Sequence, residues 1–175
     1  SEKKDPKTLV VVTSGDNPPF EFYKQDQGKR ILTGFDIDLA HAIAERLDLT
    51  LVIQDIPFNS LIPALQSKRA DMALAALTQT PERERIIDYS IPYDKVAVSV
   101  LTLKDLFISD EKELYNKRVG VQLGTSYESH VKDISSTYHI TLKSLNLLGE
   151  LIQELKTKRI DAVITEKSVA LAYEA

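Results

Sequence analysis

The sequence contains no cysteine among its 175 residues. That absence excludes disulfides, thiolate catalysis and cysteine-ligated metal sites, and it fits either the bacterial periplasm or the cytosol. No apolar run approaches the roughly 20 residues that a membrane-spanning helix needs. The net charge of −4, without a basic stripe interleaved with aromatic residues, argues against a nucleic-acid-binding surface. Hydrophobic content of 43% and charged content of 27% are typical of a globular protein.

Several signatures of enzymes are also missing. The sequence has no G-x-G-x-x-G loop, no Walker loop and no G-x-S-x-G nucleophile elbow. The histidines, His41, His130 and His139, show no metal-ligand spacing, and we interpret them as surface residues. Asp36 and Asp38 resemble a metal pair, but two residues so spaced point about 200° apart on a helix. We therefore expect a helix cap and a solvated Asp there, and neither a metal nor a cofactor.

What the chain does have is an internal repeat. The segment LIPALQSKRADMAL, residues 61–74, recurs ninety positions later as LIQELKTKRIDAVI, residues 151–164. In each copy an amphipathic helix ends in Lys-Arg, and an Asp leads into a short apolar strand. A helix-to-strand unit used twice at this distance predicts two similar α/β lobes, and clefts between domains are common sites for small ligands. The alternative is that a common α/β element occurs twice by chance.

Strand and helix patterns alternate along the chain. The β-rich runs that indicate strands are 9–13, 51–53, 72–77, 96–103, 118–122, 140–142 and 160–164. In the first half they alternate with helical patterns, at 36–47 and in the first repeat, which favours a mostly parallel sheet with helices on its faces. Turn residues occupy 26–29. Because the run 96–103 is the longest, we expect it to cross between the lobes, with lobe 1 at 1–100 and lobe 2 at 101–175.

Polar residues near the expected strand ends favour a binding site for a free amino acid. The carboxylate of such a ligand needs a bidentate cation and backbone N–H groups, and its ammonium needs an acidic residue. Thr80, followed by proline, marks a helix start, which places Arg83 in the first turn. Thr78 lies at the preceding strand end, with its N–H toward a ligand. The alternative for Arg83 is an ion pair with Glu82 or Glu84.

The second lobe offers matching residues. Thr125 and Ser126 lie at an expected helix N-terminus, where the helix dipole also favours an anion. Glu166 follows the strand of the second repeat, so it emerges at a carboxyl end, where open α/β sheets place their ligands. The alternative for Glu166 is a solvated helix cap. The joint placement of these residues at strand ends of two lobes favours the binding site over the separate alternatives.

Five motifs occur in order along the chain: PPFEF (18–22), GFDIDL (34–39), PALQ (63–66), T-x-TPER (78–83) and DYS-x-PY (88–93). Together they resemble those of the bacterial extracellular solute-binding proteins of the polar amino-acid uptake family (family 3), the receptors of ABC importers, with the arginine- and other basic amino-acid-binding receptors most similar. The resemblance implies a two-lobed α/β fold of the type II periplasmic binding proteins, with mostly parallel sheets flanked by helices and a ligand cleft between the lobes. It also implies a periplasmic or otherwise extracytoplasmic protein that serves ABC permease subunits, with a lipid anchor upstream of Ser1 left open.

The resemblance implies a role for ten residues. Arg83 should clamp the ligand carboxylate, helped by Thr78 and by Ser126 across the cleft. Glu166 stands where the acidic residue of the family binds the α-ammonium. Phe58 occupies the position of an aromatic residue that stacks against the ligand side chain. The remaining residues expected to line the pocket are Ser14, Asn17, Ala76, Gln122 and Thr125.

Three of these positions bear on the choice of ligand. Asn17 stands where the family often has an aromatic residue, and Ser14 where it often has an Asp, so the side-chain pocket is more polar and less charged. Gln122 adds no cation that would repel a basic side chain, and a guanidinium would stack on the aromatic residue. We therefore expect arginine first, lysine or ornithine second and glutamine third. Only Asp16 and Glu21 are evident as acidic partners for a distal guanidinium.

We expect a receptor that closes on one amino acid by hinge motion and makes or breaks no bond. Full-length relatives complete the second lobe and return to the first, so the second lobe and the return hinge are expected to be incomplete in a chain ending at Ala175. Two alternatives stay open. One is a cyclohexadienyl or arogenate dehydratase on the same scaffold, with Glu166 as the general acid. The other is the ligand-binding domain of a sensor or receptor.

Overall fold

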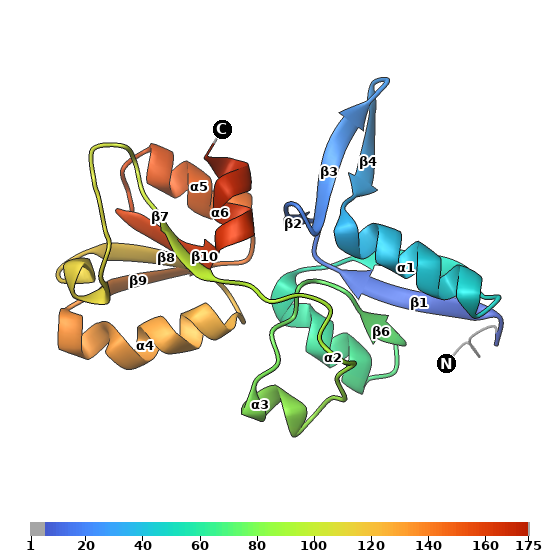
Figure 1. Cartoon of the computed structure of the whole chain (residues 1–175). Helices are drawn as coiled ribbons and strands as arrows, with labels where there is room; N and C mark the ends of the chain where they lie inside the picture. Colours follow the sequence, from blue (N-terminus) through green and yellow to red (C-terminus); the bar gives the residue numbers. More distant parts are fainter. Residues whose placement is uncertain (1–5, 175) are drawn as a thin grey trace. The chain divides into compact units, whose positions relative to one another are not determined.

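The structure is a computed structural model that describes residues 6–174 (Figure 1). The chain divides between Ser90 and Ile91 into two compact units, and each unit is an α/β structure in its own right. Within residues 6–174, no helix combines the length and the apolar character needed to cross a membrane. Each unit has its own sheet and its own core.

The first unit is built on a parallel sheet with the strand order β5-β1-β6. Its strands are β1 (Thr8–Thr13), β5 (Thr50–Asp55) and β6 (Met72–Ala73). The central strand, β1, pairs in parallel with β5 along its whole length and with β6 near its carboxyl end. The mostly parallel sheet predicted from the β-α-β-α-β order is thus confirmed for this unit.

Helices cover both faces of that sheet. The helices of the first unit are α1 (Phe35–Arg46), the 3₁₀ helix η1 (Phe58–Ser60), α2 (Leu61–Gln66) and α3 (Pro81–Glu84). On one face Leu9 and Val11 of β1 pack with α1, while on the other Val10 and Val12 pack with Leu61 of α2. Consecutive strand residues point to opposite faces, so a strand buried on both sides is apolar throughout.

A small three-stranded antiparallel sheet precedes α1. It consists of β2 (Asp16–Asn17), β3 (Glu21–Asp26) and β4 (Lys29–Thr33). The turn predicted at residues 26–29 is present, and its central residues Gln27 and Gly28 have φ angles of 48° and 76°, as a two-residue hairpin turn requires. Gly34, between β4 and α1, has a φ of 127°, and a Cβ there would lie 2.3 Å from the carbonyl oxygen of Phe20. Only glycine therefore fits between the hairpin and the helix.

The strand predicted at 72–77 is shorter than expected. Only Met72 and Ala73 form β6, because Ala76 adopts a φ of 48° and its N–H donates to Asp36 Oδ2 at 3.0 Å. A left-handed residue ends a strand, so residues beyond Ala76 run as a loop toward α3. The predicted start of α3 is confirmed, since Thr80 Oγ1 accepts a hydrogen bond from Arg83 N–H at 3.3 Å.

The second unit is a four-stranded mixed sheet in the order β7-β10-β8-β9. Its strands are β7 (Val98–Leu101), β8 (Arg118–Gln122), β9 (Thr141–Leu145) and β10 (Ala162–Glu166). Its helices are the 3₁₀ helix η2 (Glu111–Leu114), α4 (Ser126–Tyr138), α5 (Leu148–Lys156) and α6 (Lys167–Tyr173). β8, β9 and β10 run parallel, with α4 on one face and α5 and α6 on the other (Figure 1).

The edge strand β7 comes from the long run 96–103. It pairs antiparallel with β10, from Val98 opposite Glu166 to Leu101 opposite Val163, which makes it part of the second unit. The chain accordingly divides between Ser90 and Ile91, whereas the boundary expected from the sequence lay at residue 100. The pairing with β10 accounts for the difference, because it attaches the run to the second sheet.

Candidate functional site

Arg83 is held inside the first unit by the loop that follows β6. The residue is 9% exposed, and its Nη1 donates to the carbonyl oxygen of Thr78 at 2.7 Å. Its guanidinium carbon lies 5.8 Å from the ring centroid of Phe58, within the range of a cation–π contact. A guanidinium carries five N–H donors in a planar fork, so these contacts orient a group whose geometry matches a carboxylate.

The carbonyl oxygen of Thr78 accepts two hydrogen bonds in this loop. It accepts from Arg83 and also from the hydroxyl of Tyr89, at 3.1 Å. Burial is the main cause that raises the pKa of Tyr89, so its hydroxyl remains a protonated donor at neutral pH. The sequence assigned Thr78 a role through its N–H; the structure adds that its carbonyl fixes Arg83. Tyr89 belongs to the motif at 88–93, which was its only signal in the sequence.

Two other predicted residues of the first unit face acidic partners. Ser14 is 2% exposed, and its Oγ donates to Asp16 Oδ1 at 3.3 Å. Asn17 is 7% exposed, and its Nδ2 donates to Glu21 Oε1 at 3.1 Å. Ser14 follows the carboxyl end of β1, Phe58 follows that of β5, and Ala76 follows that of β6. The first unit thus gathers its predicted residues at one end of a parallel sheet, where α/β proteins bind ligands.

Two expectations about acidic residues in this unit are wrong. Asp36 does not cap α1 through its side chain: the N-cap residue is Gly34, and Asp36 is fully buried with Oδ2 bonded to the N–H of Ala76. Asp38 is exposed, as expected. Glu21 is no partner for a ligand guanidinium, because it is fully buried and hydrogen-bonded to Asn17 and Asp36. Burial first, and then the charge of Asp36, raises the pKa of Glu21 to about 11, so it is neutral at physiological pH.

In the second unit, the predicted residues begin at the end of β8. Gln122 is 6% exposed, and its Nε2 donates to the carbonyl oxygen of Asn146 at 3.0 Å. Thr125 is the N-cap of α4: its Oγ1 accepts from the N–H of Glu128 at 3.2 Å and donates to the carbonyl oxygen of Gln122 at 2.7 Å. This cap places Ser126 at the first position of a 13-residue helix, where the dipole favours negative charge.

Glu166 ends β10 and is 8% exposed. Although it occupies the N-cap position of α6, its side chain makes no capping bond, so the solvated-cap alternative is wrong. Its Oε2 accepts from Thr165 Oγ1 at 3.3 Å, and the carboxyl group is also hydrogen-bonded to the hydroxyl of Tyr127. Burial, followed by the charge of Glu166, raises the pKa of Tyr127, which keeps that hydroxyl protonated as a donor. Sequence reasoning missed Tyr127, whose signal was its place directly after Ser126.

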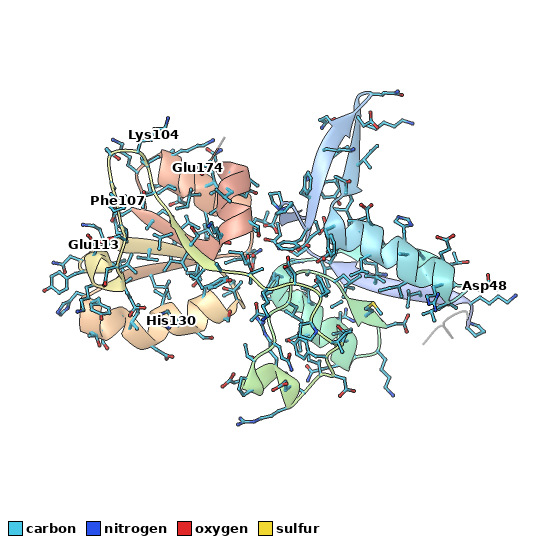
Figure 2. All side chains as sticks on the ribbon, in the orientation of Figure 1. Asp48, Lys104, Phe107, Glu113, His130 and Glu174 are labelled. Carbon is cyan, nitrogen blue, oxygen red and sulfur yellow. The ribbon has the colours of Figure 1, made fainter. Side chains whose placement is uncertain are left out.

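The three histidines lie on the surface, as predicted. All are exposed, and His130 is labelled on α4 in Figure 2. A ring nitrogen of His130 lies 2.7 Å from a carboxylate oxygen of Glu111. Within residues 6–174, no three His, Cys, Asp or Glu side chains are grouped as they would be to hold a metal ion. The main polar groups at the strand ends are the guanidinium of Arg83 beside Phe58 in the first unit and the carboxyl group of Glu166 beside Tyr127 in the second.

Two α/β units, each with polar residues at the carboxyl ends of parallel strands, define the type II periplasmic binding protein fold. The chain belongs to the bacterial extracellular solute-binding proteins, family 3, whose sequence model matches residues 9–118. It is 40% identical over 167 residues to the arginine-binding extracellular protein ArtP of Bacillus subtilis (strain 168), covering 95% of this chain and 64% of ArtP. The predicted family and fold class are thereby confirmed.

Two further proteins show how far the likeness extends. The L-cystine-binding protein TcyJ of Escherichia coli (strain K12) is 31% identical over 170 residues, covering 96% of this chain and 62% of TcyJ. The solved structure of an ancestral arginine-binding protein bound to arginine superposes with a TM-score of 0.90 at 42% identity, covering 95% of this chain and 73% of that one. The chain thus spans slightly less than two thirds of the length of the curated relatives it matches.

Proposed function

We propose that this protein is the substrate-binding receptor of an ABC importer and that it binds a free amino acid outside the cytoplasm. The observation that carries the proposal is the pair of buried charged residues at the strand ends: Arg83 in the first unit and Glu166 in the second. A free amino acid carries a carboxylate, which suits the planar fork of a guanidinium, and an ammonium, which suits a carboxylate. Among its relatives, the proteins named for arginine and for cystine support this class of ligand.

Arginine is the ligand that we infer first, followed by lysine or ornithine and then glutamine. Phe58 lies near the guanidinium of Arg83, and we expect its ring to stack on the guanidinium of the ligand as well. Gln122 contributes an amide rather than a positive charge, so it does not repel a basic side chain. With Glu21 buried and neutral, Asp16 is the remaining acidic partner considered for the distal group. Arginine comes first because its side chain is both cationic and flat. Lysine and ornithine have the positive charge without the flat group, and glutamine has a flat amide without the charge.

The test is isothermal titration of protein that has been unfolded, stripped of carried ligand and refolded, against arginine, lysine, ornithine, glutamine and glutamate. Arg83→Ala should weaken arginine binding by about 2–5 kcal/mol, the range for truncating one partner of a buried charge pair. Arg85→Ala is the matched control, because Arg85 is an exposed arginine two residues further along. Binding by Arg83→Ala as tight as that of the parent would remove Arg83 from the site. If the parent protein bound none of these amino acids, the proposed receptor function would be contradicted.

A further inference from the structure

Two acidic residues to which the proposed function gives no role meet inside the first unit. Glu21 begins β3, and Asp36 lies in the first turn of α1; both residues are 0% exposed, and their carboxyl groups lie close enough to interact. The backbone brings them together. Asp36 N–H donates to the carbonyl oxygen of Phe20 at 2.8 Å, and Gly34 lies so close to that carbonyl that no Cβ would fit. The close approach of hairpin and helix therefore buries two acids side by side.

The pair is bonded on both sides. Glu21 Oε1 accepts from Asn17 Nδ2 at 3.1 Å, and Asp36 Oδ2 accepts from the N–H of Ala76 at 3.0 Å. Ala76 has a φ of 48°, a left-handed conformation that is unfavourable for a residue with a Cβ. Its bond to Asp36 stabilises that conformation. Because Ala76 begins the loop whose Thr78 carbonyl holds Arg83, the bond to Asp36 connects the buried pair to the candidate carboxylate clamp.

The two carboxyl groups cannot both be ionised. Two carboxylates in contact in a buried site repel each other, so one of them keeps a proton. The charged groups that face Glu21 are Asp36 on α1 and Asp16 on β2, and both are acidic. Burial and these neighbours raise the pKa of Glu21, whereas the bond from Asn17 acts in the opposite direction. Burial and the neighbouring acids therefore favour the protonated form of Glu21, while Asp36 Oδ2 accepts from the N–H of Ala76.

We propose that Glu21 and Asp36 share one proton and act as a positioning pair that holds the loop from Ala76 to Arg83 in its ligand-binding conformation. The inference rests on the proposed function in one respect, namely that Arg83 binds the ligand. Neither carboxyl group touches the ligand itself. Their effect on binding passes through the hydrogen bond from the N–H of Ala76 to Asp36, which fixes the start of the loop that holds Arg83.

The shared proton can be tested without any ligand. In protein labelled with ¹³C at the glutamate side chains, the carboxyl carbon of Glu21 should keep the chemical shift of a protonated acid from pH 4 to pH 9. The spectrum of Glu21→Gln identifies the resonance by its absence. A Glu21 carboxyl carbon that titrates between pH 4 and 5 would show an ordinary, ionised glutamate and would overturn the shared proton.

The positioning role is tested by binding, at a temperature where every variant is fully folded. Asp36→Ala removes the acceptor of the Ala76 N–H, and we expect arginine affinity to fall by at least about tenfold. Asp36→Asn keeps an oxygen for that N–H and should recover much of the loss. Glu21→Gln mimics the protonated acid, so its affinity should stay within about twofold of the parent. Asp38→Asn is the matched control, because Asp38 lies exposed in the same turn of α1.

The outcomes separate this inference from the proposed function. The backbone amide resonance of Ala76 should move in Asp36→Ala and stay in place in Asp38→Asn, whether or not a ligand is present. If the parent binds no amino acid while Glu21 remains protonated and the Ala76 resonance moves as expected, the proposed function fails and the pair still holds its loop. If Asp36→Ala is folded and binds arginine as tightly as the parent, the positioning role is overturned.

Discussion

Residues 61–74 and 151–164, the two copies of the repeat, take the same backbone path in the two units. In each copy the residue after the helix cap is a lysine in the left-handed region: φ is 58° at Lys68 and 59° at Lys158. In each copy the following arginine N–H donates back into the helix, at 3.0 Å in the first and 2.9 Å in the second. The agreement favours a true repeat over two chance occurrences of a common element.

The aspartate of the repeat shows the same correspondence. Asp71 Oδ2 accepts from the N–H of Val10 at 2.8 Å, and Asp161 Oδ2 accepts from the N–H of Arg118, also at 2.8 Å. In both units the N–H of the aspartate donates in return to the carbonyl oxygen of the same strand residue. The aspartate therefore attaches each copy to a parallel neighbouring strand, β1 in the first unit and β8 in the second. Its role in the sequence pattern is structural, and it carries no ligand chemistry.

The copies differ in the strand and the residues to which each of them leads. In the first, β6 is a two-residue edge strand, and position 76 is an alanine whose backbone turns toward Asp36. In the second, β10 is a five-residue interior strand, and the equivalent position is Glu166 with a buried carboxylate. The same repeat thus leads through a loop to Arg83 in the first unit, whereas in the second unit its strand ends directly in Glu166. The repeat positions the site, and the residues beyond it determine the charge.

The comparison is tested most strongly at the first leucine of each copy. Leu61 and Leu151 are both 0% exposed, so Leu61→Ala and Leu151→Ala should each destabilise the protein by about 2–5 kcal/mol. Amide hydrogen exchange locates the loss, since each substitution should lower protection mainly in its own sheet, at Val11 of β1 or at Val121 of β8. The matched control is Leu171→Ala, a leucine that is 54% exposed. A substitution that weakened both sheets equally would contradict two separate cores.

The aspartates sharpen the comparison with a smaller effect. Asp71→Ala and Asp161→Ala should each cost about 1–2 kcal/mol by leaving a strand N–H without its acceptor, with Asp161→Ala the larger. Asp161 also accepts from Arg118 Nε and Nη2, at 3.1 and 2.8 Å. That bond lowers the pKa of Asp161, so its extra stabilisation is present above its ordinary pKa of 3.8 and is lost as the pH falls through the lower folded value.

Denaturant unfolding of both aspartate variants at pH 7 and pH 3 measures these contributions. Asp133→Ala, at an exposed position on α4, serves as the control. The difference in unfolding free energy between the two variants should narrow at pH 3, because below the ordinary pKa of 3.8 the stabilisation that Asp161 gains from its pair with Arg118 begins to be lost. A difference that grew at pH 3 would show that the pair with Arg118 is not its origin.

How much of the fold was predictable depends on how local its causes are. The repeat, the helix 36–47 and the cap at Thr80 were recognised because periodicity and capping act within one or two turns. The length of β6 was not predicted, because the turn at Ala76 depends on a hydrogen bond to Asp36, which lies forty residues earlier. The place of the run 96–103 has an equally distant cause, since β7 joins the second sheet through its pairing with β10.

The site divides in the same way. Arg83 and Glu166 were identified from their places after predicted strands, and the structure shows both buried with defined neighbours. Their contacts with a ligand stay predictions. Tyr127 was missed because its place after Ser126 was its only local signal, and its contact with the carboxyl group of Glu166 joins α4 to the end of β10. Glu21 was misjudged because an acidic residue in a strand pattern gives no sign that its charge will be lost.

The smallest expected effect concerns a glutamate that only one copy has. Glu154 accepts from Lys143 Nζ at 2.7 Å and from Arg159 Nε at 2.8 Å, and these bonds, Arg159 first, lower its pKa from an ordinary 4.5 to about 2. At the equivalent position the first copy has the buried Ala64, and Arg69 donates instead to Ser67 Oγ at 2.9 Å. Because the folded pKa is depressed, the stabilisation is complete above 4.5 and disappears as the pH falls toward 2. Exposed ion pairs contribute little, so we expect Glu154→Gln to flatten the acid limb of stability slightly, in the second unit only. Hydrogen exchange between pH 5 and pH 2.5 would measure this effect, with Glu150→Gln as the exposed control on α5. If the stability of Glu154→Gln falls with pH in parallel with that of the parent, the two copies do not differ at this position.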